Sequence, residues 1–278
     1  MINSNTYRRI IDFKLLHESG CFLLPNPWDV GSAKLFASLG FKALATTSSG
    51  YAWSRGVSDG EVSLEDTLIH MSEIADATEL PVNADFGNGF ASTPEQVAHN
   101  VRLAIGTGVA SISIEDSTGD KISPLRDIKD AVNIIRSARK TIDESDSNMQ
   151  LVGRAENFFV GDNNLDDTIV RLKAYADAGA DCLYAPGIKT REQITAVVEA
   201  VYPKPVNVLI GWESSLTLQE LSNLGVRRVS MGGALSKIAT SAALDSLNKV
   251  VTYGNFDNIS SSLSSQYLND FFGNENNK

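Results

Sequence analysis

Acidic and basic side chains gather directly after three apolar segments of this chain, which end at Asp85, Glu115 and Arg154. Two converging carboxylates repel each other unless a cation lies between them, and their oxygen atoms suit a hard divalent ion such as Mg²⁺. A guanidinium nearby can fork onto a carboxylate or an enolate oxygen. These residue types predict metal-assisted chemistry on a small acid.

Eight short apolar segments, each followed by a helix-like stretch, must position these side chains. They are Cys21–Pro25, Lys42–Thr47, Pro81–Asp85, Ala110–Glu115, Gln150–Arg154, Asp181–Ala185, Pro205–Ile210 and Arg227–Met231. Such apolar runs are typical of parallel strands covered on both faces. Gly40, Gly108, Gly179 and Gly225 each precede a strand and can take the left-handed conformation that closes a helix. The repeated units predict an α/β fold, a (β/α)₈ TIM barrel over residues 1–252.

In such a barrel the ends of neighbouring strands share one rim, so Asp85, Glu115 and Arg154 are expected to face one pocket. A structural role is the alternative: Asp85 would cap its loop, Glu115 would pair with a basic residue of the barrel, and Arg154 would pair with Glu156 or Glu115. A doubly wound open sheet is the alternative fold, but its dinucleotide-binding turn needs several glycines and PNPWDVGSAK offers only Gly31.

Hydroxyl-bearing residues follow the second predicted strand. The run from Thr46 to Gly50 could donate hydrogen bonds to an anion, and the long loop Tyr51–Glu61 behind it carries Asp59. The same run is also compatible with an ordinary turn. The three histidines, His17, His70 and His99, are predicted on helices away from the strand ends, which disfavours a Ser-His-Asp hydrolase and a His-rich zinc site.

Composition narrows the classes of partner. With 42% apolar residues in 278, the chain can bury a large core, and it has no apolar stretch long enough to span a bilayer. The N-terminus lacks the apolar region of a secretory signal, which predicts a cytoplasmic location. A net charge of −10 argues against nucleic acid and anionic membranes as partners. Cys21 and Cys182 are predicted to be free thiols.

Several motifs in order carry a family resemblance. From about Phe22 to Ala242 the chain contains LLPNPWDVGSAKLFASLGFKALATTSSG, RGVSDGE, PVNADFGNGF, ISIEDS, GRAENFF, YADAGADCLYAPG and LGVRRVSMGGAL. In order and spacing these resemble the isocitrate lyase/phosphoenolpyruvate mutase superfamily. The fold that this resemblance implies is the barrel already inferred.

The resemblance implies roles for individual residues. Asp85 matches an aspartate that binds Mg²⁺ directly, with Mn²⁺ as the alternative ion, while Asp59 and Glu115 match acids that reach the metal through water. Arg154 matches an arginine that contacts the substrate carboxylate or the developing enolate. Thr47, Ser48 and Ser49 occupy the loop that cradles the substrate oxyanion. On this basis Arg154 and Asp59 are the expected catalytic residues.

Departures from the family pattern limit the reaction. An acid is expected two positions after Asp85, but Gly87 stands there, so Asn83, Asn88 or Asp116 would have to compensate. The segment Ser117–Ser123 carries neither the Cys-Gly-His motif of isocitrate and methylisocitrate lyases nor the Lys-Thr-Asn-Ser loop of phosphoenolpyruvate mutase. Decarboxylation needs a Lewis acid and an electron sink but no acid for the departing group. Water or Tyr184 would protonate the enolate.

The sequence therefore predicts a Mg²⁺-dependent carbon–carbon lyase for a small 2-oxo or 2-hydroxy di- or tricarboxylic acid, of the oxaloacetate decarboxylase or methylisocitrate lyase kind. Two alternatives stay open. One is a phosphorus–carbon bond enzyme, such as a phosphonopyruvate hydrolase or a phosphoenolpyruvate mutase. The other is a barrel that binds a metabolite without turning it over.

The C-terminal segment, residues 253–278, is predicted to contain one amphipathic helix. Its apolar stripe consists of Leu263, Tyr267, Leu268, Phe271 and Phe272. The stripe either packs across its own barrel or, as the resemblance suggests, is exchanged between the subunits of a homo-oligomer, a dimer or a tetramer.

Overall fold

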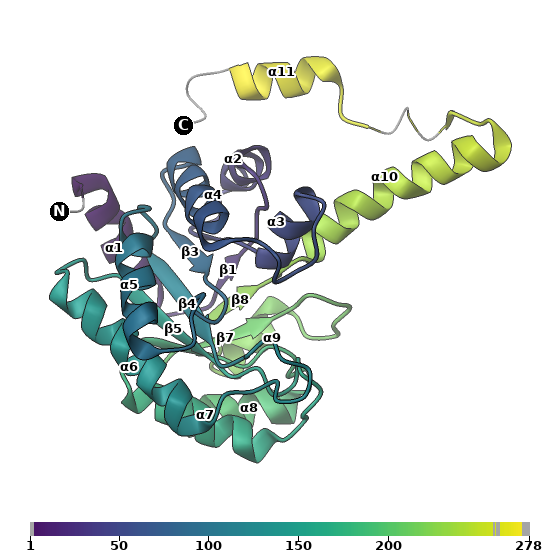
Figure 1. Cartoon of the computed structure of the whole chain (residues 1–278). Coiled ribbons are helices and arrows are strands. Elements are labelled where there is room, and N and C mark those ends of the chain that lie inside the picture. Colours follow the sequence, from purple (N-terminus) through teal and green to yellow (C-terminus); the bar gives the residue numbers. More distant parts are fainter. Residues whose placement is uncertain (1–2, 258, 260–261, 274–278) are drawn as a thin grey trace.

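The computed structural model describes residues 3–257, 259 and 262–273. Eight parallel strands form one sheet in the order β1-β8-β7-β6-β5-β4-β3-β2, which confirms the predicted barrel (Figure 1). The strands are β1 (Phe22–Leu24), β2 (Leu44–Ala45), β3 (Val82–Asp85), β4 (Ser111–Glu115), β5 (Gln150–Arg154), β6 (Cys182–Tyr184), β7 (Val206–Leu209) and β8 (Arg228–Ser230). Each lies within its predicted segment.

The barrel closes between β1 and β2 through a short seam. The amide of Ala45 donates to the carbonyl of Pro25 at 3.1 Å. Next to it, buried Asn26 donates through Nδ2 to the carbonyl of Thr46 at 2.9 Å and accepts at Oδ1 from the amides of Met231 and Gly232. One side chain therefore ties the ends of β1, β2 and β8 together at the rim.

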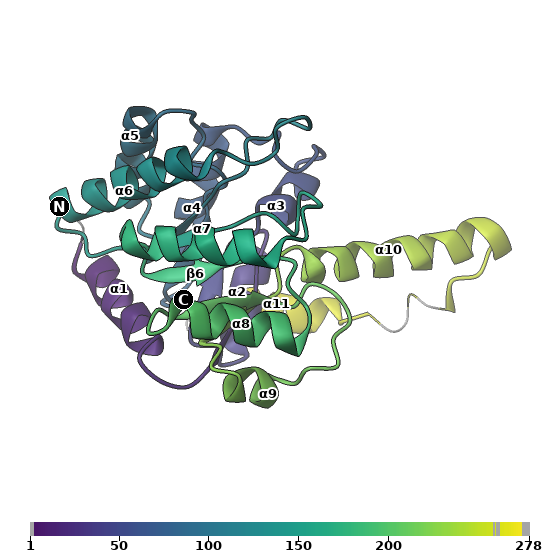
Figure 2. The same ribbon diagram turned by 90° about the horizontal axis from the view of Figure 1, so that it is seen from below.

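Helices surround the barrel, as the two views show (Figures 1 and 2). They are α1 (Ser4–Leu16), α2 (Val30–Ser38), α3 (Ser48–Ser54), α4 (Leu64–Ala77), α5 (Pro94–Ile105), α6 (Ile128–Glu144), α7 (Leu165–Asp177), α8 (Arg191–Val201), α9 (Leu218–Asn223), α10 (Ala234–Tyr253) and α11 (Ser265–Gly273). Most begin with a side-chain cap, such as Thr93 before α5 and Thr190 before α8. Because these caps accept from the first free amides, they fix where each helix leaves the strand end.

The predicted helix-closing glycines adopt the expected backbone. Gly40, Gly108, Gly179 and Gly225 have φ of +82°, +83°, +106° and +86°. At Gly179 an added Cβ would also lie 2.5 Å from Cγ of Arg139, so the chain needs glycine there for space as well as for conformation.

The C-terminal part leaves the barrel. Helix α10 projects away from it in both views, and α11 runs back toward the barrel (Figures 1 and 2). On α10, Leu244, Leu247 and Val251 are exposed by 54%, 57% and 84%, so this arm is uncovered in the single chain. In the predicted stripe of α11, Leu268 and Phe271 are half-buried and Phe272 approaches Gly31 of α2. Residues 274–278 of the predicted tail lie outside the described part.

Cys21 and Cys182 are both free thiols, as predicted. Cys182 is buried and Cys21 is half-buried. None of the described helices combines the length and apolar character needed to cross a bilayer.

Candidate active site

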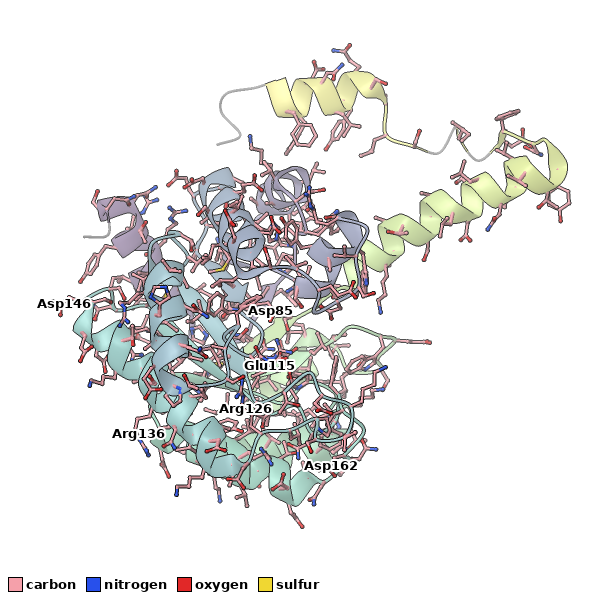
Figure 3. All side chains as sticks on the ribbon, in the orientation of Figure 1. Asp85, Glu115, Arg126, Arg136, Asp146 and Asp162 are labelled. Atoms are coloured by element: carbon pink, nitrogen blue, oxygen red, sulfur yellow. The ribbon has the colours of Figure 1, made fainter. Side chains whose placement is uncertain are left out.

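A cavity of about 690 Å³ opens at the carboxyl ends of the strands. All of the predicted site residues line it: Thr47, Ser48, Ser49, Asp59, Asp85, Glu115 and Arg154. Figure 3 shows the labelled Asp85 and Glu115 near each other in the middle of the molecule, whereas Arg136, Asp146 and Asp162 lie at its edge. The barrel therefore brings together side chains that are up to 107 positions apart in the sequence.

Arg154 is the centre of the charged cluster. Its Nη1 lies 2.7 Å from Oδ1 of Asp85, its Nη2 lies 3.0 Å from Oε2 of Glu115, and its Nε and Nη2 both lie 3.0 Å from Oε1 of Glu156. Strand register explains part of this, because Glu115 and Arg154 are direct partners across β4 and β5. The pairing of Arg154 with Glu115 and Glu156 is the one that the structural alternative expected, and Asp85 joins it.

Burial and mutual charge shift the pKa values of the groups in this cluster. Desolvation raises the pKa of Glu115 and that of Glu156, the latter to about 8, because burial and neighbouring carboxylates outweigh the attraction of Arg154. Burial alone would lower the pKa of Arg154, but Glu156, Glu115 and Asp85 raise it well above its ordinary value. The guanidinium therefore stays charged, while the carboxylates around it resist carrying full charge together.

The hydroxyl-rich segment differs from the expected open loop. Thr47 is the N-cap of α3, with Oγ1 accepting from the amide of Gly50 at 3.2 Å, so Tyr51–Ser54 are helical rather than part of a long loop. The amide of Ser48 donates to Oδ2 of Asp85 at 3.2 Å. The start of α3 is therefore joined to β3, and the hydroxyls of Thr47 and Ser49 lie 3.2 Å apart beside the cavity.

Asp59 lies at the mouth of the cavity on the loop after α3. The residue is exposed, yet partial desolvation of its carboxyl group, together with the charge of Asp85, raises its pKa. Hydrogen bonding by Ser48 opposes the rise. The carboxylates of Asp59 and Asp85 therefore repel each other across the cavity.

Asp116 is turned away from the site. It is 2% exposed and accepts from the phenol of Tyr175 at 2.6 Å, from Nη1 of Arg171 at 3.1 Å and from the amide of Glu156 at 2.9 Å. Its oxygens are thus occupied in the layer behind the barrel, and it does not line the cavity. The expectation that Asp116 could replace the missing acid is wrong, because alternation along the chain points it to the opposite side from Glu115.

Gly87 leaves an open space where the family pattern has an acid. It lines the cavity, its φ is +49°, and a Cβ placed on it would have no atom within 4 Å. Asn83 and Asn88 also line the cavity, but Oδ1 of Asn83 accepts from Arg228 at 3.3 Å and Oδ1 of Asn88 accepts from the amide of Phe90 at 3.1 Å. The gap at Gly87 is therefore not filled by another carboxylate.

The charges and donors of the site fit a hard divalent cation. Four carboxyl groups, those of Asp59, Asp85, Glu115 and Glu156, line the cavity and supply oxygen donors, and Arg154 contacts three of them. Among the described residues no three His, Cys, Asp or Glu side chains converge closely enough to hold a metal. Carboxyl oxygen donors suit Mg²⁺, which keeps several waters and takes one or two carboxylates, better than Zn²⁺.

Sequence reasoning missed several residues of the cavity wall. His70 is on a helix, as predicted, but it lines the cavity and stacks on Tyr51 with ring centroids 3.8 Å apart and an interplanar angle of 9°. Trp53 also lines it, as does Tyr184, which the sequence had already suggested as a proton donor. The helical periodicity of Leu64–Ala77 could have indicated that His70 faces inward, since Met71 and Ile74 beside it are buried.

Arg154 also lies over the ring of Tyr184, its register partner on β6, with Cζ 5.0 Å from the ring centroid. Tyr184 is only 9% exposed, and burial followed by the nearby carboxylates raises the pKa of its phenol. The phenol therefore keeps its proton beside the charged cluster.

The chain is similar in sequence and in fold to several known proteins. Residues 13–251 match the family model of phosphoenolpyruvate phosphomutase. A structure from Burkholderia cenocepacia J2315, named only as a candidate lyase/mutase, is 41% identical, covers 99% of both chains and has a TM-score of 0.96. The oxaloacetate decarboxylase of Pseudomonas putida (strain GB-1) is 27% identical over 241 residues, 84% of this chain and 81% of that protein. An oxaloacetate acetylhydrolase solved with its product oxalate is 26% identical, with a TM-score of 0.85 over 97% of this chain and 96% of that one.

Proposed function

Because the chain belongs to the phosphoenolpyruvate mutase/isocitrate lyase superfamily, we propose that it is a Mg²⁺-dependent carbon–carbon lyase. Its substrate would be a small 2-oxo or 2-hydroxy di- or tricarboxylic acid, with decarboxylation of oxaloacetate as the leading reaction. One observation carries this proposal: Arg154 lies within hydrogen-bonding distance of Asp85, Glu115 and Glu156 in the wall of a cavity large enough for such an acid.

The metal would be held by Asp85 directly, with Asp59 and Glu115 contributing through water. When bound, Mg²⁺ would act as a Lewis acid that withdraws electron density from the 2-oxo group. Because Asp85 is already engaged by Arg154 and by the amide of Ser48, metal binding would have to compete with these two donors.

The residues of the chain supply binding and charge stabilisation. The fork of Arg154 would hold the carboxylate and the developing enolate oxygen, where a planar pair of donors is better than a point charge. Thr47, Ser48 and Ser49 would donate to the same end of the substrate. In oxaloacetate the bond from C3 to the departing carboxylate breaks, carbon dioxide leaves, and its electron pair forms the enolate of pyruvate.

A proton must then reach C3 of the enolate to give pyruvate. Water or the buried, protonated phenol of Tyr184 would deliver it, since Tyr184 lies next to Arg154 in the same cavity. The absence of the lyase cysteine in Ser117–Ser123 is compatible with this reaction, because carbon dioxide leaves without being protonated.

The function is tested by incubating the protein with oxaloacetate, with and without Mg²⁺, and measuring pyruvate. Metal-dependent pyruvate formation that Asp85→Ala abolishes would support the lyase. Phosphorus NMR with phosphonopyruvate would reveal the phosphorus–carbon alternative as released phosphate or as isomerised product. Binding of metal and acids without turnover of any of them would favour the non-catalytic barrel.

We also propose that the protein works as a homo-oligomer that exchanges its C-terminal helices. The support is the exposed apolar face of α10, formed by Leu244, Leu247 and Val251. Such a face on a projecting helix is costly in water unless a second copy covers it.

A further inference from the structure

A buried arginine without an acidic partner lies deep in the same cavity. Arg228, the first residue of β8, lines the cavity and is only 2% exposed. Its Nε donates to Oδ1 of Asn207 at 3.0 Å and its Nη1 donates to Oδ1 of Asn83 at 3.3 Å. Both partners are neutral amides, so the charge of this guanidinium is not balanced by the residues that it contacts.

The groups around Arg228 make the imbalance larger. The ring of Phe13 lies against it, with Cζ of Arg228 5.9 Å from the ring centroid, and His17, Arg154, Cys182 and Tyr184 are its other electrostatic neighbours. Among the described residues, no carboxylate pairs with Arg228 and no acceptor lies within hydrogen-bonding distance of its Nη2. A buried charge of this kind is costly unless an anion accompanies it.

The amides around Arg228 form a small polar floor. Nδ2 of Asn207 donates to Oγ of Ser230 at 3.0 Å, and this bond together with the one from Arg228 fixes the orientation of the Asn207 amide. Asn83, Asn207, Arg228 and Ser230 all line the cavity. This polar floor therefore holds the guanidinium of Arg228 in place at the cavity, with Nη2 free to donate to an anionic ligand.

The position of this floor relative to the charged cluster follows from β3. Asn83 and Asp85 are two residues apart on one strand, so they face the same side of the sheet and lie about 7 Å apart along it. Arg228 is bonded to the first and Arg154 to the second. An acid with one end at Arg154 would thus have its other end near Arg228, at a separation that a short dicarboxylate can span.

We propose that Arg228, positioned by Asn83 and Asn207, forms a second carboxylate-binding position at the floor of the cavity. It holds the carboxylate of the substrate that is farthest from the 2-oxo or 2-hydroxy group. This inference rests on the proposed function and deepens it, because it assigns the distal carboxylate of the di- or tricarboxylic substrate to a named residue. Arg228 is then a specificity residue, which in oxaloacetate would hold the carboxylate that departs, while Arg154 serves the end where the enolate forms.

The test compares acids that differ only in the distal carboxylate. With Mg²⁺ present, calorimetry measures the Kd of lactate against malate and of 2-oxobutyrate against 2-oxoglutarate, with oxalate as the probe of the reacting end. In the wild-type protein the diacid of at least one pair should bind about 10- to 100-fold more tightly, the range for a hydrogen bond to a charged group. Arg228→Met should remove this preference and leave the Kd of oxalate within about twofold.

A matched control separates the loss of the positive charge of Arg228 from the loss of any other positive charge of the protein. Arg227→Met removes the neighbouring guanidinium, which donates to the carbonyl of Gly20 outside the cavity, and it should leave the diacid preference intact. If the wild-type protein does not distinguish the members of either pair, if Arg228→Met keeps the preference, or if it weakens oxalate equally, the inference is wrong. Failure of the wild-type protein to bind oxalate at all would instead count against the proposed function.

Because removing Arg228 changes a buried network, thermal unfolding of each variant is measured first. Should Arg228→Met fail to fold, Arg228→Lys provides the second variant, and the two acid pairs are compared on it and on the wild-type protein. Lysine keeps the charge but loses the fork, so it should retain part of the diacid preference. A lysine variant that keeps the full wild-type preference would overturn the inference, because the fork of the guanidinium would then not be needed.

Discussion

Arg154 and Asp85 lie 2.7 Å apart although their strands, β5 and β3, are not neighbours in the barrel. The guanidinium reaches across β4, where it also contacts Glu115. Asp85 is therefore held through both oxygens, by Arg154 and by the amide of Ser48. This links the predicted metal ligand to the predicted substrate-binding arginine, and a change at either residue should be felt at the other.

Replacing Arg154 by lysine should nearly abolish turnover. Lysine keeps the positive charge among Asp85, Glu115 and Glu156 but cannot present two parallel donors to a carboxylate or an enolate. Loss of one such donor costs about 10²–10³ in rate in known enzymes, so kcat/KM for oxaloacetate should fall by about that factor. Arg126→Lys is the control, since Arg126 binds the carbonyls of Ala91 and Ser92 outside the cavity. A kcat/KM within tenfold of wild type for Arg154→Lys would contradict this role.

An acid introduced at Gly87 should strengthen Mg²⁺ binding. The position lines the cavity and has free space around it, and aspartate tolerates positive φ better than most residues. Gly87→Asp should lower the Kd for Mg²⁺ by about tenfold, the effect of roughly 1.4 kcal/mol. Gly161→Asp, also at positive φ but in open space away from the cavity, controls for the backbone cost. Equal Mg²⁺ affinities in wild type and Gly87→Asp, measured by calorimetry, would show that Gly87 does not face the metal.

Acid should destabilise the fold partly through His70. Burial lowers the pKa of this histidine to about 4, below the unfolded value of 6.5. Its contribution to stability is thus complete above pH 6.5 and is lost as the pH falls toward 4, with a total of about 3 kcal/mol. His70→Phe keeps a ring against Tyr51 and removes the titration, so its unfolding free energy should fall less steeply over this range. The exposed His99→Phe should behave like wild type; equal slopes for all three proteins would contradict the prediction.

The apolar face of α10 should govern the oligomeric state. Introducing two charges there, Leu244→Glu with Leu247→Glu, should convert the proposed homo-oligomer into a monomer, because buried charges without partners disfavour association. Light scattering gives the mass directly. Ala242→Glu with Lys249→Glu places the charges on the opposite face of the same helix and should leave the mass unchanged. A wild-type protein that is already monomeric at working concentration would contradict the exchange of helices.

Much of the fold follows from the sequence, because parallel strands covered on both faces leave an unambiguous apolar signal. β5 was predicted with the observed bounds, Gln150–Arg154, and the other strands lie inside their predicted segments. The residues at the strand ends could be placed at one rim for the same reason. Alternation along the strand could also have indicated that Asp116, one residue after Glu115, points its carboxylate to the opposite side, into the layer behind the barrel.

What escaped prediction depends on contacts between distant segments. The helix α3 begins at Ser48 because Thr47 caps it, a local signal that the run of hydroxyls concealed. Asn26 closes the barrel only because β1, β2 and β8 meet there, and Arg228 is held at the cavity by Asn83 of β3 and Asn207 of β7. The position of a residue along a strand can be predicted from the sequence. The contacts of Asn26 and Arg228 cannot, because they form only when the barrel closes.

The proposed enolate-stabilising metal site is tested most directly by calorimetric titration of oxalate, a planar mimic of the pyruvate enolate. The titration is made with Mg²⁺, without it, and with Mg²⁺ on Asp85→Ala. We predict binding that requires both the metal and Asp85, at least about 100-fold weaker when either is missing, a loss of roughly 2.7 kcal/mol. Oxalate binding of equal strength in all three titrations, or none in any of them, would contradict the metal-assisted lyase.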